Sequence, residues 1–346
     1  MIDQIRLDVN SRVPKYMQII DSIMHNISNG STRIGDKVPS INKLSEEYYL
    51  SRDTVERAYN VLKKRKVIVS IHGKGTYVAK THTATKLNVL FLINKFSTYK
   101  MKIYNSFLNE LGDNAHIDLH SYHCDEALFL ELINKYKSEY DYYVIMPHFR
   151  SENLSHSNLT EKARIALSKI PQDSLVLLDN NQHALEGDFI EVYQDFEKDI
   201  FSSLEKALNK ISKYKKLILF YPESTFYPYP SGIAKGFKKF CGCNGFEFEV
   251  RNEVSGDMNL EEGCLYLTIE EDDLVNLVKQ IRASSYQMGQ NIGVISYNDT
   301  SLKQLLGITV VSTDFDAIGE EAAKMIFNKT KKKIKAPFNF IDRESV

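Results

Sequence analysis

The sequence predicts an α/β protein in which a small helical head with a β-hairpin precedes a larger body of parallel β-sheets. The chain has 346 residues, more than one hydrophobic core usually organises, so we expect at least two domains. Its first 80 residues contain three short helical patterns followed by two β-rich stretches. From residue 87 onward, short apolar runs alternate with longer helical patterns, which is typical of βαβ units.

The head is predicted to contain three helices. Pro14 can begin the first helix, and Gly30 and Gly35 end it. Ser40 is the predicted N-cap of the second helix and Ser51 that of the third. The apolar faces of the three helices are Met17, Ile20, Met24 and Ile27; Ile41, Leu44 and Tyr48; and Val55, Tyr59 and Leu62.

The third helix leaves polar side chains exposed at its beginning and basic side chains at its end. Arg52 and Thr54 lie in its first turn, outside the apolar face, and residues 63–66 are all Lys or Arg. In a helix-turn-helix, the first turn of the recognition helix is the part that reaches base edges. The two β-rich stretches then predict a hairpin wing with His72 and Lys74 at its tip.

Residues 10–79 resemble the winged-helix DNA-binding domain of GntR-type transcription regulators. The residues that carry the resemblance are Pro14, Tyr16, Gln18-Ile19, Gly35, Val38-Pro39-Ser40, Leu44-Ser45, Ser51-Arg52-Asp53-Thr54-Val55, Ala58-Tyr59, Leu62 and Gly73-Lys74-Gly75-Thr76-Tyr77-Val78. The resemblance implies a homodimer that binds a double-stranded DNA operator through the second helix, the third helix and the wing. The implied DNA contacts are Ser40, Lys43, Ser51, Arg52, Thr54, His72, Gly73 and Lys74, to which we add Arg57 from the third helix.

Two positions depart from the family pattern and bear on base specificity. Asn42 and Glu56 stand where the family most often has arginine. The Glu56 carboxylate can accept a hydrogen bond from cytosine N4. Alternatively, it pairs with Asn60 or Lys63 and does not contact DNA.

Charge is divided unevenly between the two parts of the chain. Residues 1–80 hold 14 Lys and Arg against 8 Asp and Glu, a balance of +6. The remaining residues hold 30 of the 44 Lys and Arg and 37 of the 45 Asp and Glu, a balance of −7. We therefore expect that only the head meets a polyanion.

The body is predicted to hold two sheets with helices between their strands. The predicted strands span 87–93, 116–123, 141–147, 174–180, 189–194, 216–222, 246–252, 267–269, 291–299 and 308–313. The predicted helices span 100–112, 126–137, 160–170, 197–211, 231–245 and 271–282. Residues 81–86 are small and polar and predict a linker, which places the domains at 1–80 and 87–346.

Ligands of open α/β sheets bind outside the carboxyl ends of strands, so polar and aromatic residues that follow the strands are candidate contacts. Carboxylates, amides and rings together suit a neutral polyol, because hydroxyl groups form hydrogen bonds and a sugar CH face stacks on a ring. We select as effector contacts Phe96, Tyr99, His148, Arg150, Asp179, Asp195, Tyr227, Asn298 and Asp299. Asn94, His123, Asn180, Glu223, Tyr229 and Glu270 also follow predicted strands.

Residues 87–346 resemble the effector domain of LacI-type regulators, which is related to periplasmic sugar-binding proteins. The matching stretches are SLVLLD (174–179), VYQD (192–195), GIAKGF (232–237), IGVISYND (292–299) and 309–319. The resemblance implies a periplasmic-binding-protein-like body of two subdomains, with a monosaccharide such as a pentose or deoxyhexose in the cleft and its hydroxyls held by Asn298 or Asp299. The arginine that commonly precedes the GF-containing helix is absent, and Arg150 is a candidate substitute.

No pattern singles out a catalytic residue, a cofactor or a metal site. The sequence lacks a GxxxxGK[ST] loop, HExxH zinc spacing and a GxSxG elbow. Cys124, Cys241, Cys243 and Cys264 lack metal-ligand spacing, and we expect them to be reduced. Because the sequence has no apolar run of about 18 residues and no secretion-signal pattern, we expect a cytoplasmic protein that does not bind a membrane.

These observations predict a sequence-specific transcriptional regulator, a dimeric repressor whose carbohydrate effector binds in the cleft of the body. Two alternatives remain at this point. One is a sugar-modifying enzyme with Asp179 or Asp299 as the base and a head that tethers it to DNA; turnover of a sugar would favour it. The other is a DNA-binding dimer whose body binds no ligand, which would show no thermal shift with any sugar.

Overall fold

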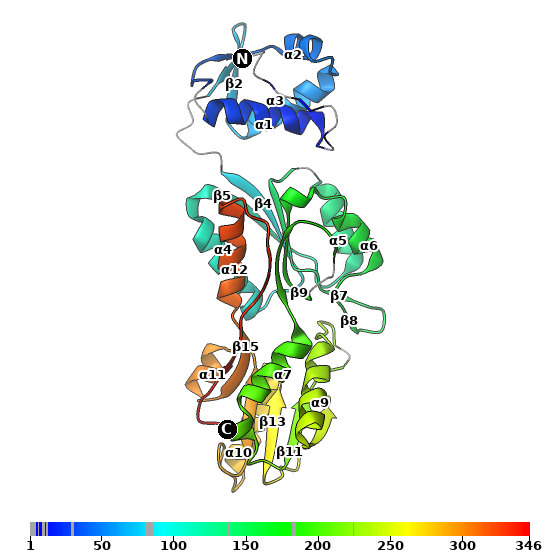
Figure 1. The fold of residues 1–346 in the computed structure, drawn as a ribbon, viewed down its shortest axis with the longest axis vertical. Helices are drawn as coiled ribbons and strands as arrows, with labels where there is room; N and C mark the ends of the chain where they lie inside the picture. Colours follow the sequence, from blue (N-terminus) through cyan, green and yellow to red (C-terminus); the bar gives the residue numbers. More distant parts are fainter. Residues whose placement is uncertain are drawn as a thin grey trace. The chain divides into compact units, whose positions relative to one another are not determined.

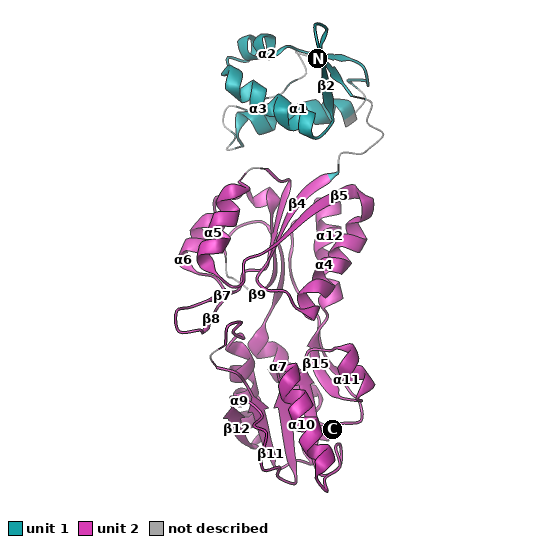
Figure 2. Ribbon diagram, turned by 180° about the vertical axis from the view of Figure 1, so that it is seen from behind, with its two compact units in different colours: residues 1–86 teal, residues 87–346 magenta. Residues whose placement is uncertain are grey.

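The computed structural model describes residues 5, 7–8, 11, 13–28, 31–79, 86–137, 139–181, 185–223 and 225–346. The chain divides into two compact units, Met1–Lys86 and Leu87–Val346, which we call the head and the body (Figure 2). Of the predicted linker, residues 81–85 lie outside the described residues.

The head consists of three helices and a small antiparallel sheet. Its helices are α1 (Lys15–Ser28), α2 (Ile41–Glu47) and α3 (Arg52–Lys64), and its strands are β1 (Lys37–Val38), β2 (Ile68–Ile71) and β3 (Gly75–Val78) in the order β1-β3-β2. Both predicted caps are confirmed. The hydroxyl of Ser40 accepts a hydrogen bond from the amide of Lys43, and that of Ser51 from the amide of Thr54, each at 3.2 Å.

The buried face of α1 differs from the predicted one. Its buried apolar side chains are Tyr16, Ile19, Ile20 and Ile23. Met17, Met24 and Ile27 are only partly buried against this core. Both sets recur at helical spacing, so the periodicity of the sequence gave the helix but did not give the centre of the face that packs against α3.

The body contains two six-stranded sheets, each with its own helices, and we call these halves the first and second subdomains (Figure 1). The first sheet has the order β16-β10-β9-β6-β4-β5, and its strand pairs are parallel. Its strands are β4 (Leu87–Ile93), β5 (Ala115–Ser121), β6 (Tyr142–Ile145), β9 (Leu175–Asn181), β10 (Ile190–Gln194) and β16 (Lys333–Lys335). The helices of this subdomain are α4 (Thr98–Leu111), α5 (Glu126–Lys135), α6 (Glu161–Leu167) and α12 (Phe315–Phe327). A hairpin of β7 (Phe149–Arg150) and β8 (His156–Ser157) also follows β6.

The second sheet has the order β12-β11-β13-β14-β15-β17, and it is parallel except for β17, which is antiparallel to β15. Its strands are β11 (Lys216–Phe220), β12 (Glu247–Arg251), β13 (Cys264–Thr268), β14 (Gly293–Tyr297), β15 (Thr309–Thr313) and β17 (Phe338–Ile341). The helices of this subdomain are α7 (Phe196–Lys206), α8 (Leu208–Ile211), α9 (Gly232–Asn244), α10 (Glu271–Ala283) and α11 (Ser301–Leu305). Apolar clusters bury both faces of each sheet, as parallel strands require.

The chain passes between the two subdomains three times: from β10 to α7, from β15 to α12 and from β16 to β17. After the second passage, α12 packs beside α4 of the first subdomain (Figure 1). The two helices meet at Gly319, where a Cβ atom would lie 2.1 Å from the Ser106 hydroxyl and 2.2 Å from the carbonyl oxygen of Ile103. Only glycine permits this approach, which fixes the last helix of the chain against the first helix of the body.

The predicted α/β body of two subdomains is confirmed, with three local corrections. The predicted strand 267–269 is the end of the longer β13, which begins just after the turn at Gly263 (φ +79°). The predicted helix 197–211 is divided at Ala207 into α7 and α8. The elements β7, β8, α11, α12, β16 and β17 were not predicted. The four strands have two to four residues each, too few for a clear apolar alternation.

Candidate DNA-binding surface and effector pocket

The predicted contacts of α2 and α3 lie at the N-terminal ends of these helices. Ser40 and Lys43 are exposed at the start of α2, and Ser51 and Arg52 are exposed at the start of α3, with Thr54 partly buried. The hydroxyls of Ser51 and Thr54 are 2.7 Å apart. Arg52 forms no ion pair with a described residue, so its guanidinium is available to an external partner.

Arg57 and Glu56 have different surroundings on α3. The guanidinium of Arg57 lies 4.1 Å from the centroid of the Tyr16 ring, a cation–π contact that ties α3 to α1. Arg57 therefore contributes to packing within the head. Glu56 forms no hydrogen bond or ion pair with Asn60 or Lys63 in the described part of the head, so the pairing considered from the sequence is not observed.

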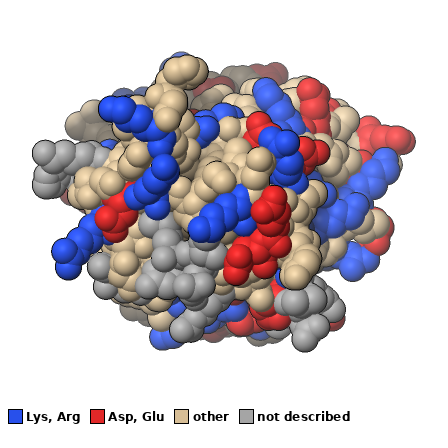
Figure 3. Space-filling view, turned by 90° about the horizontal axis from the view of Figure 1, so that it is seen from above, with Lys and Arg blue, Asp and Glu red and all other residues tan. Residues whose placement is uncertain are grey.

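The wing presents its turn between β2 and β3. His72, Gly73 and Lys74 are exposed there, and Gly73 has φ +72°, which glycine adopts without strain. The Tyr77 hydroxyl donates a hydrogen bond of 3.0 Å to the carbonyl of Lys74 and stabilises the turn. On the face drawn in Figure 3, Lys and Arg side chains lie in separate groups with Asp and Glu side chains among them, so positive charge does not form one continuous surface on that face.

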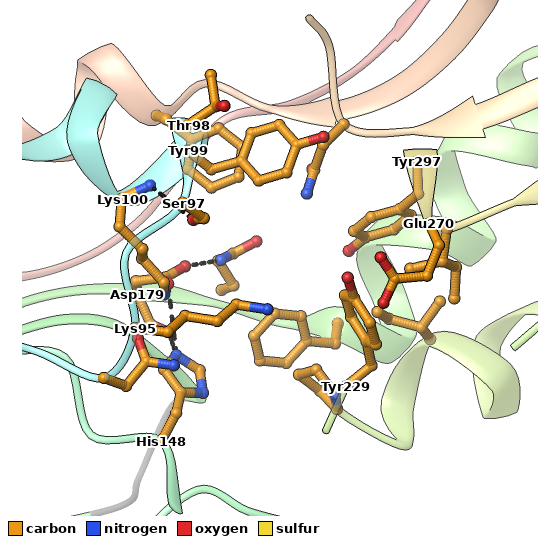
Figure 4. Close-up of a pocket in the computed structure, with 18 of the residues that line it drawn as sticks. Lys95, Ser97, Thr98, Tyr99, Lys100, His148, Asp179, Tyr229, Glu270 and Tyr297 are labelled. Carbon is orange, nitrogen blue, oxygen red and sulfur yellow. Dashed lines mark hydrogen bonds and ion pairs between the residues drawn. The ribbon is translucent and has the colours of Figure 1, made fainter. Parts of the chain in front are cut away.

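The body contains a cavity of about 310 Å³ between its two subdomains, at the carboxyl ends of the strands of both sheets. This volume lies at the lower end of the range for small-molecule sites. Asn94, Lys95, Lys100, His148 and Asp179 line it from the first subdomain. Tyr229, Ile233, Glu270, Glu271 and Tyr297 line it from the second (Figure 4).

A buried polar network forms the first-subdomain wall of the cavity. Lys100 of α4 forms an ion pair with Asp179 of β9, and the other carboxylate oxygen of Asp179 accepts a hydrogen bond from the Gln194 amide. The side-chain oxygen Oε1 of Gln194 in turn accepts a hydrogen bond from the Thr313 hydroxyl. Burial, and next to it the positive charge of Lys95, lower the pKa of Lys100 to about 7. The network connects the cavity to β10 and β15, the strands at which the chain passes between subdomains.

Asp179 is held in an unfavourable backbone conformation beside a pair of histidines. Its φ of +57° lies in the left-handed region, which costs a residue other than glycine about 1–3 kcal/mol. Nε2 of His148 contacts the Asp179 carbonyl, and Nδ1 of His148 lies 2.8 Å from Nε2 of His156. Burial lowers the pKa of both histidines, that of His156 to about 4, so the pair is neutral at pH 7.

Aromatic rings and polar atoms without partners make the cavity suitable for a polyol. Tyr99 and Phe315 stack with ring centroids 5.1 Å apart and supply an apolar surface. The buried atoms Asn94 Oδ1, Tyr297 Oη and Asn298 Oδ1 have no hydrogen-bond partner among the described residues. Because buried polar atoms are nearly always hydrogen-bonded in folded proteins, these three atoms are available to the hydroxyl groups of a ligand.

The structure brings together four of the nine predicted effector contacts: Tyr99, His148, Asp179 and Asn298 line the cavity. Phe96, Arg150, Asp195, Tyr227 and Asp299 do not line it. Asp195 instead caps α7, where it accepts from the Lys198 amide. Asp299 accepts from Arg343 at 2.8 Å and from Gln304 at 2.9 Å. Burial raises the pKa of Asp299, but these two hydrogen bonds outweigh it and hold the pKa below its usual value.

Arg150 and Tyr227 contact the opposite subdomain. Arg150 donates a hydrogen bond of 2.8 Å to the carbonyl of Phe226, and its guanidinium lies 3.9 Å from the centroid of the Phe226 ring. The Tyr227 hydroxyl lies 3.1 Å from Nδ1 of His123. Phe96 is 60% exposed. These contacts join loops of the first subdomain to the segment that follows β11 of the second.

Several lining residues were not among the sequence-based candidates: Lys95, Lys100, Gln194, Phe196, Glu271, Thr300 and Phe315. Lys95 lies between Asn94 and Phe96 just after β4, so the rule that selected those two residues could have found it. Phe196 and Phe315 begin helices at the passages between subdomains, and the sequence pattern does not reveal those passages.

No group of His, Cys, Asp and Glu among the described residues is arranged to hold a metal ion. No helix in the described part of the chain is long and apolar enough to cross a membrane. The four cysteines are free thiols.

Together the head and body define a class of protein in which a winged-helix domain is joined to an α/β body of two subdomains with a cavity between them. Residues 15–78 match the model described as "Bacterial regulatory proteins, gntR family". The mannosyl-D-glycerate transport/metabolism system repressor MngR of Escherichia coli is 32% identical over 120 residues, which cover 35% of this chain and 42% of that protein. The match therefore spans less than half the length of that relative.

Solved structures agree with the fold of the body. The trehalose repressor from Escherichia coli has a TM-score of 0.58 at 15% identity, covering 74% of this chain and 100% of that chain. A LacI family transcriptional regulator from Lactobacillus casei, with bound glucose, has a TM-score of 0.58 at 10% identity, covering 75% of this chain and 99% of that chain. At sequence identities of 15% and 10%, this structural similarity establishes the fold of the body alone.

Proposed function

We propose that the protein is a sequence-specific transcriptional repressor whose DNA binding is controlled by a small carbohydrate held in the cavity of the body. The observation that carries the proposal is that one chain combines a gntR-family head with a two-subdomain body enclosing a polar and aromatic cavity. The glucose-bound regulator and the two repressors named above support the same assignment. The protein is not an enzyme in this proposal, and it acts on DNA in the cytoplasm.

The proposed mechanism uses a homodimer. Two heads meet half-sites about one helical turn apart, so a small change in the spacing of the heads changes operator affinity. The effector controls DNA binding only through its differential affinity for the two states of the dimer. We assign this difference in affinity to the closure of the two subdomains on the effector. The residues that we propose to read bases are Arg52 and Thr54, and Lys43, His72 and Lys74 meet the backbone.

Two measurements on the purified full chain test this function. Selection from a pool of random duplexes should recover a two-fold symmetric site if the protein is a dimeric regulator. A thermal-shift screen should then give a saturable shift with a pentose, a deoxyhexose, another monosaccharide, or one of their acids or phosphates. Failure to enrich any duplex would refute the DNA-binding role, and turnover of the bound carbohydrate would favour an enzyme.

A further inference from the structure

Among the described residues that line the cavity, Lys95 is a lysine that forms no ion pair with a carboxylate. Lys95 is the second residue after β4, and its side chain extends from the wall of Asp179 and His148 toward Tyr229 and Glu270 (Figure 4). Its ammonium lies 5.0 Å and 5.2 Å from the ring centroids of Tyr229 and Tyr227. Within the described residues, Lys95 forms no ion pair with a carboxylate. Burial lowers the pKa of Lys95, and the nearby Glu270 and Cys124 side chains act in the opposite direction.

The other cationic groups on the same side are already occupied or neutral. Lys100 pairs with the Asp179 carboxylate, and Arg150 is engaged by the carbonyl and ring of Phe226. His148 is kept neutral by burial and by nearby lysines. Among the described residues of this wall, Lys95 is therefore the cation that remains for a ligand.

The opposite wall is acidic, and its two carboxylates are not equivalent. Glu271 accepts a hydrogen bond of 2.9 Å from the Thr300 hydroxyl. Glu270 stands at the N-cap position of α10 without a side-chain capping bond, and its carboxylate faces the cavity beside Tyr229 (Figure 4). After burial, the Glu270 carboxylate is the largest influence on the pKa of Lys95 and raises it, although no ion pair joins the two groups among the described residues. The cavity thus presents an ammonium from one subdomain and a carboxylate from the other.

The geometry points to an effector that is a carbohydrate bearing a carboxylate or phosphate, with its anionic group on Lys95 and its hydroxyls directed to Glu270. This inference rests on the proposed function and narrows its ligand class. A neutral hydroxyl would satisfy one donor of the ammonium but leave its charge uncompensated in a partly desolvated site. An anionic oxygen forms a shorter and stronger charge-assisted hydrogen bond there. The Glu270 carboxylate, which only accepts hydrogen bonds, then orients the polyol end of the same molecule.

Calorimetric titration of the full chain at fixed ionic strength tests the inference. The probes are matched sets: D-glucose with D-gluconate, D-glucuronate and D-glucose 6-phosphate, and equivalent sets for galactose, mannose, fucose, arabinose and xylose. An aldonate or uronate and a sugar phosphate share the anionic chemistry, and the sets distinguish them. We expect one anionic member to bind about tenfold or more tightly than its neutral parent.

Three variants assign the effect to Lys95. Lys95→Met should weaken the anionic ligand by about tenfold or more, and should weaken its neutral parent by a smaller factor, because the neutral parent loses only a hydrogen bond. Lys95→Arg should restore most of the preference, because it keeps the charge. Lys169→Met, on the exposed surface of the same subdomain, is the matched control and should change neither affinity.

A neutral sugar that binds as tightly as its acid and its phosphate would overturn the inference. Equal losses of both affinities in Lys95→Met would also overturn it. In either case a carbohydrate still binds, so the proposed function would stand. If no neutral or anionic carbohydrate binds, the carbohydrate-controlled function fails as well, and the two failures are thus distinguishable.

Discussion

Replacement of Asp179 by Asn removes the negative charge that neutralises Lys100 inside the body. Both side chains are buried, with exposed fractions of 4% for Asp179 and 9% for Lys100. Asn has nearly the same shape and tolerates the left-handed backbone of this position, so the substitution isolates the charge. Removing one partner of a buried ion pair costs about 3–5 kcal/mol. We expect Asp179→Asn to lower the free energy of unfolding of the body by about this amount.

Urea denaturation of the full chain measures this loss. Asp195→Asn is the matched control, because Asp195 pairs with the exposed Lys198 and Asn is nearly as good a helix N-cap. Its cost should be about 1 kcal/mol or less. Adding Lys100→Met to Asp179→Asn should recover part of the loss, since no buried charge is then left unpaired. A cost of about 1 kcal/mol or less for Asp179→Asn alone would refute the reasoning.

Three further predictions concern DNA binding, helix packing and pH. Arg52→Ala should cost about 1–3 kcal/mol of binding free energy at the selected operator and less on other duplexes. Lys74→Ala should instead weaken binding to all duplexes alike and reduce the salt dependence of binding by about one unit of slope. Equal small losses on every duplex for both variants would show that Arg52 does not read bases. Gly319→Ala places a methyl group against the Ser106 side chain and the α4 backbone. It should therefore lower the free energy of unfolding by about 1–3 kcal/mol. An unchanged midpoint of urea denaturation would contradict the close approach of α12 and α4. Lys303 is fully buried and donates to two backbone carbonyls, and burial lowers its pKa to about 8. Above that pKa the unfolded chain therefore binds more protons than the folded chain, so folding becomes more favourable as the pH rises. The free energy of unfolding of the wild type, relative to that of Lys303→Met, should rise by about 2 kcal/mol from pH 7 to 9.5. A free energy of unfolding that depends on pH in the same way in both proteins would count against this prediction.

The head was predictable because its determinants are local. A cap is set by a serine and the three residues that follow it, so Ser40 and Ser51 fix the starts of α2 and α3 without reference to the rest of the chain. The contact of Arg57 with Tyr16 was not predictable, because it joins two helices whose packing the periodicity does not specify.

The cavity was only partly predictable because distant segments build it. Asp179 lies near the end of one predicted strand and Asp195 directly follows another. Asp195 caps the helix that begins there, whereas Asp179 meets Lys100. Asp299 is engaged by Arg343, which is 44 residues away in the sequence. Phe196 and Phe315 reach the cavity at passages between subdomains. The position of a residue after a strand therefore selects candidates, and tertiary contacts decide which of them face the ligand.

The central claim is that the cavity of the body and the DNA-binding surface of the head are energetically coupled. The most direct test measures operator affinity by fluorescence anisotropy with and without a saturating concentration of the carbohydrate found in the screen. We expect the carbohydrate to change the operator Kd by about 5–150-fold. The operator should change the carbohydrate Kd by the same factor, because coupling between two binding sites is reciprocal. A carbohydrate that binds in the cavity and leaves the operator Kd unchanged would contradict the account.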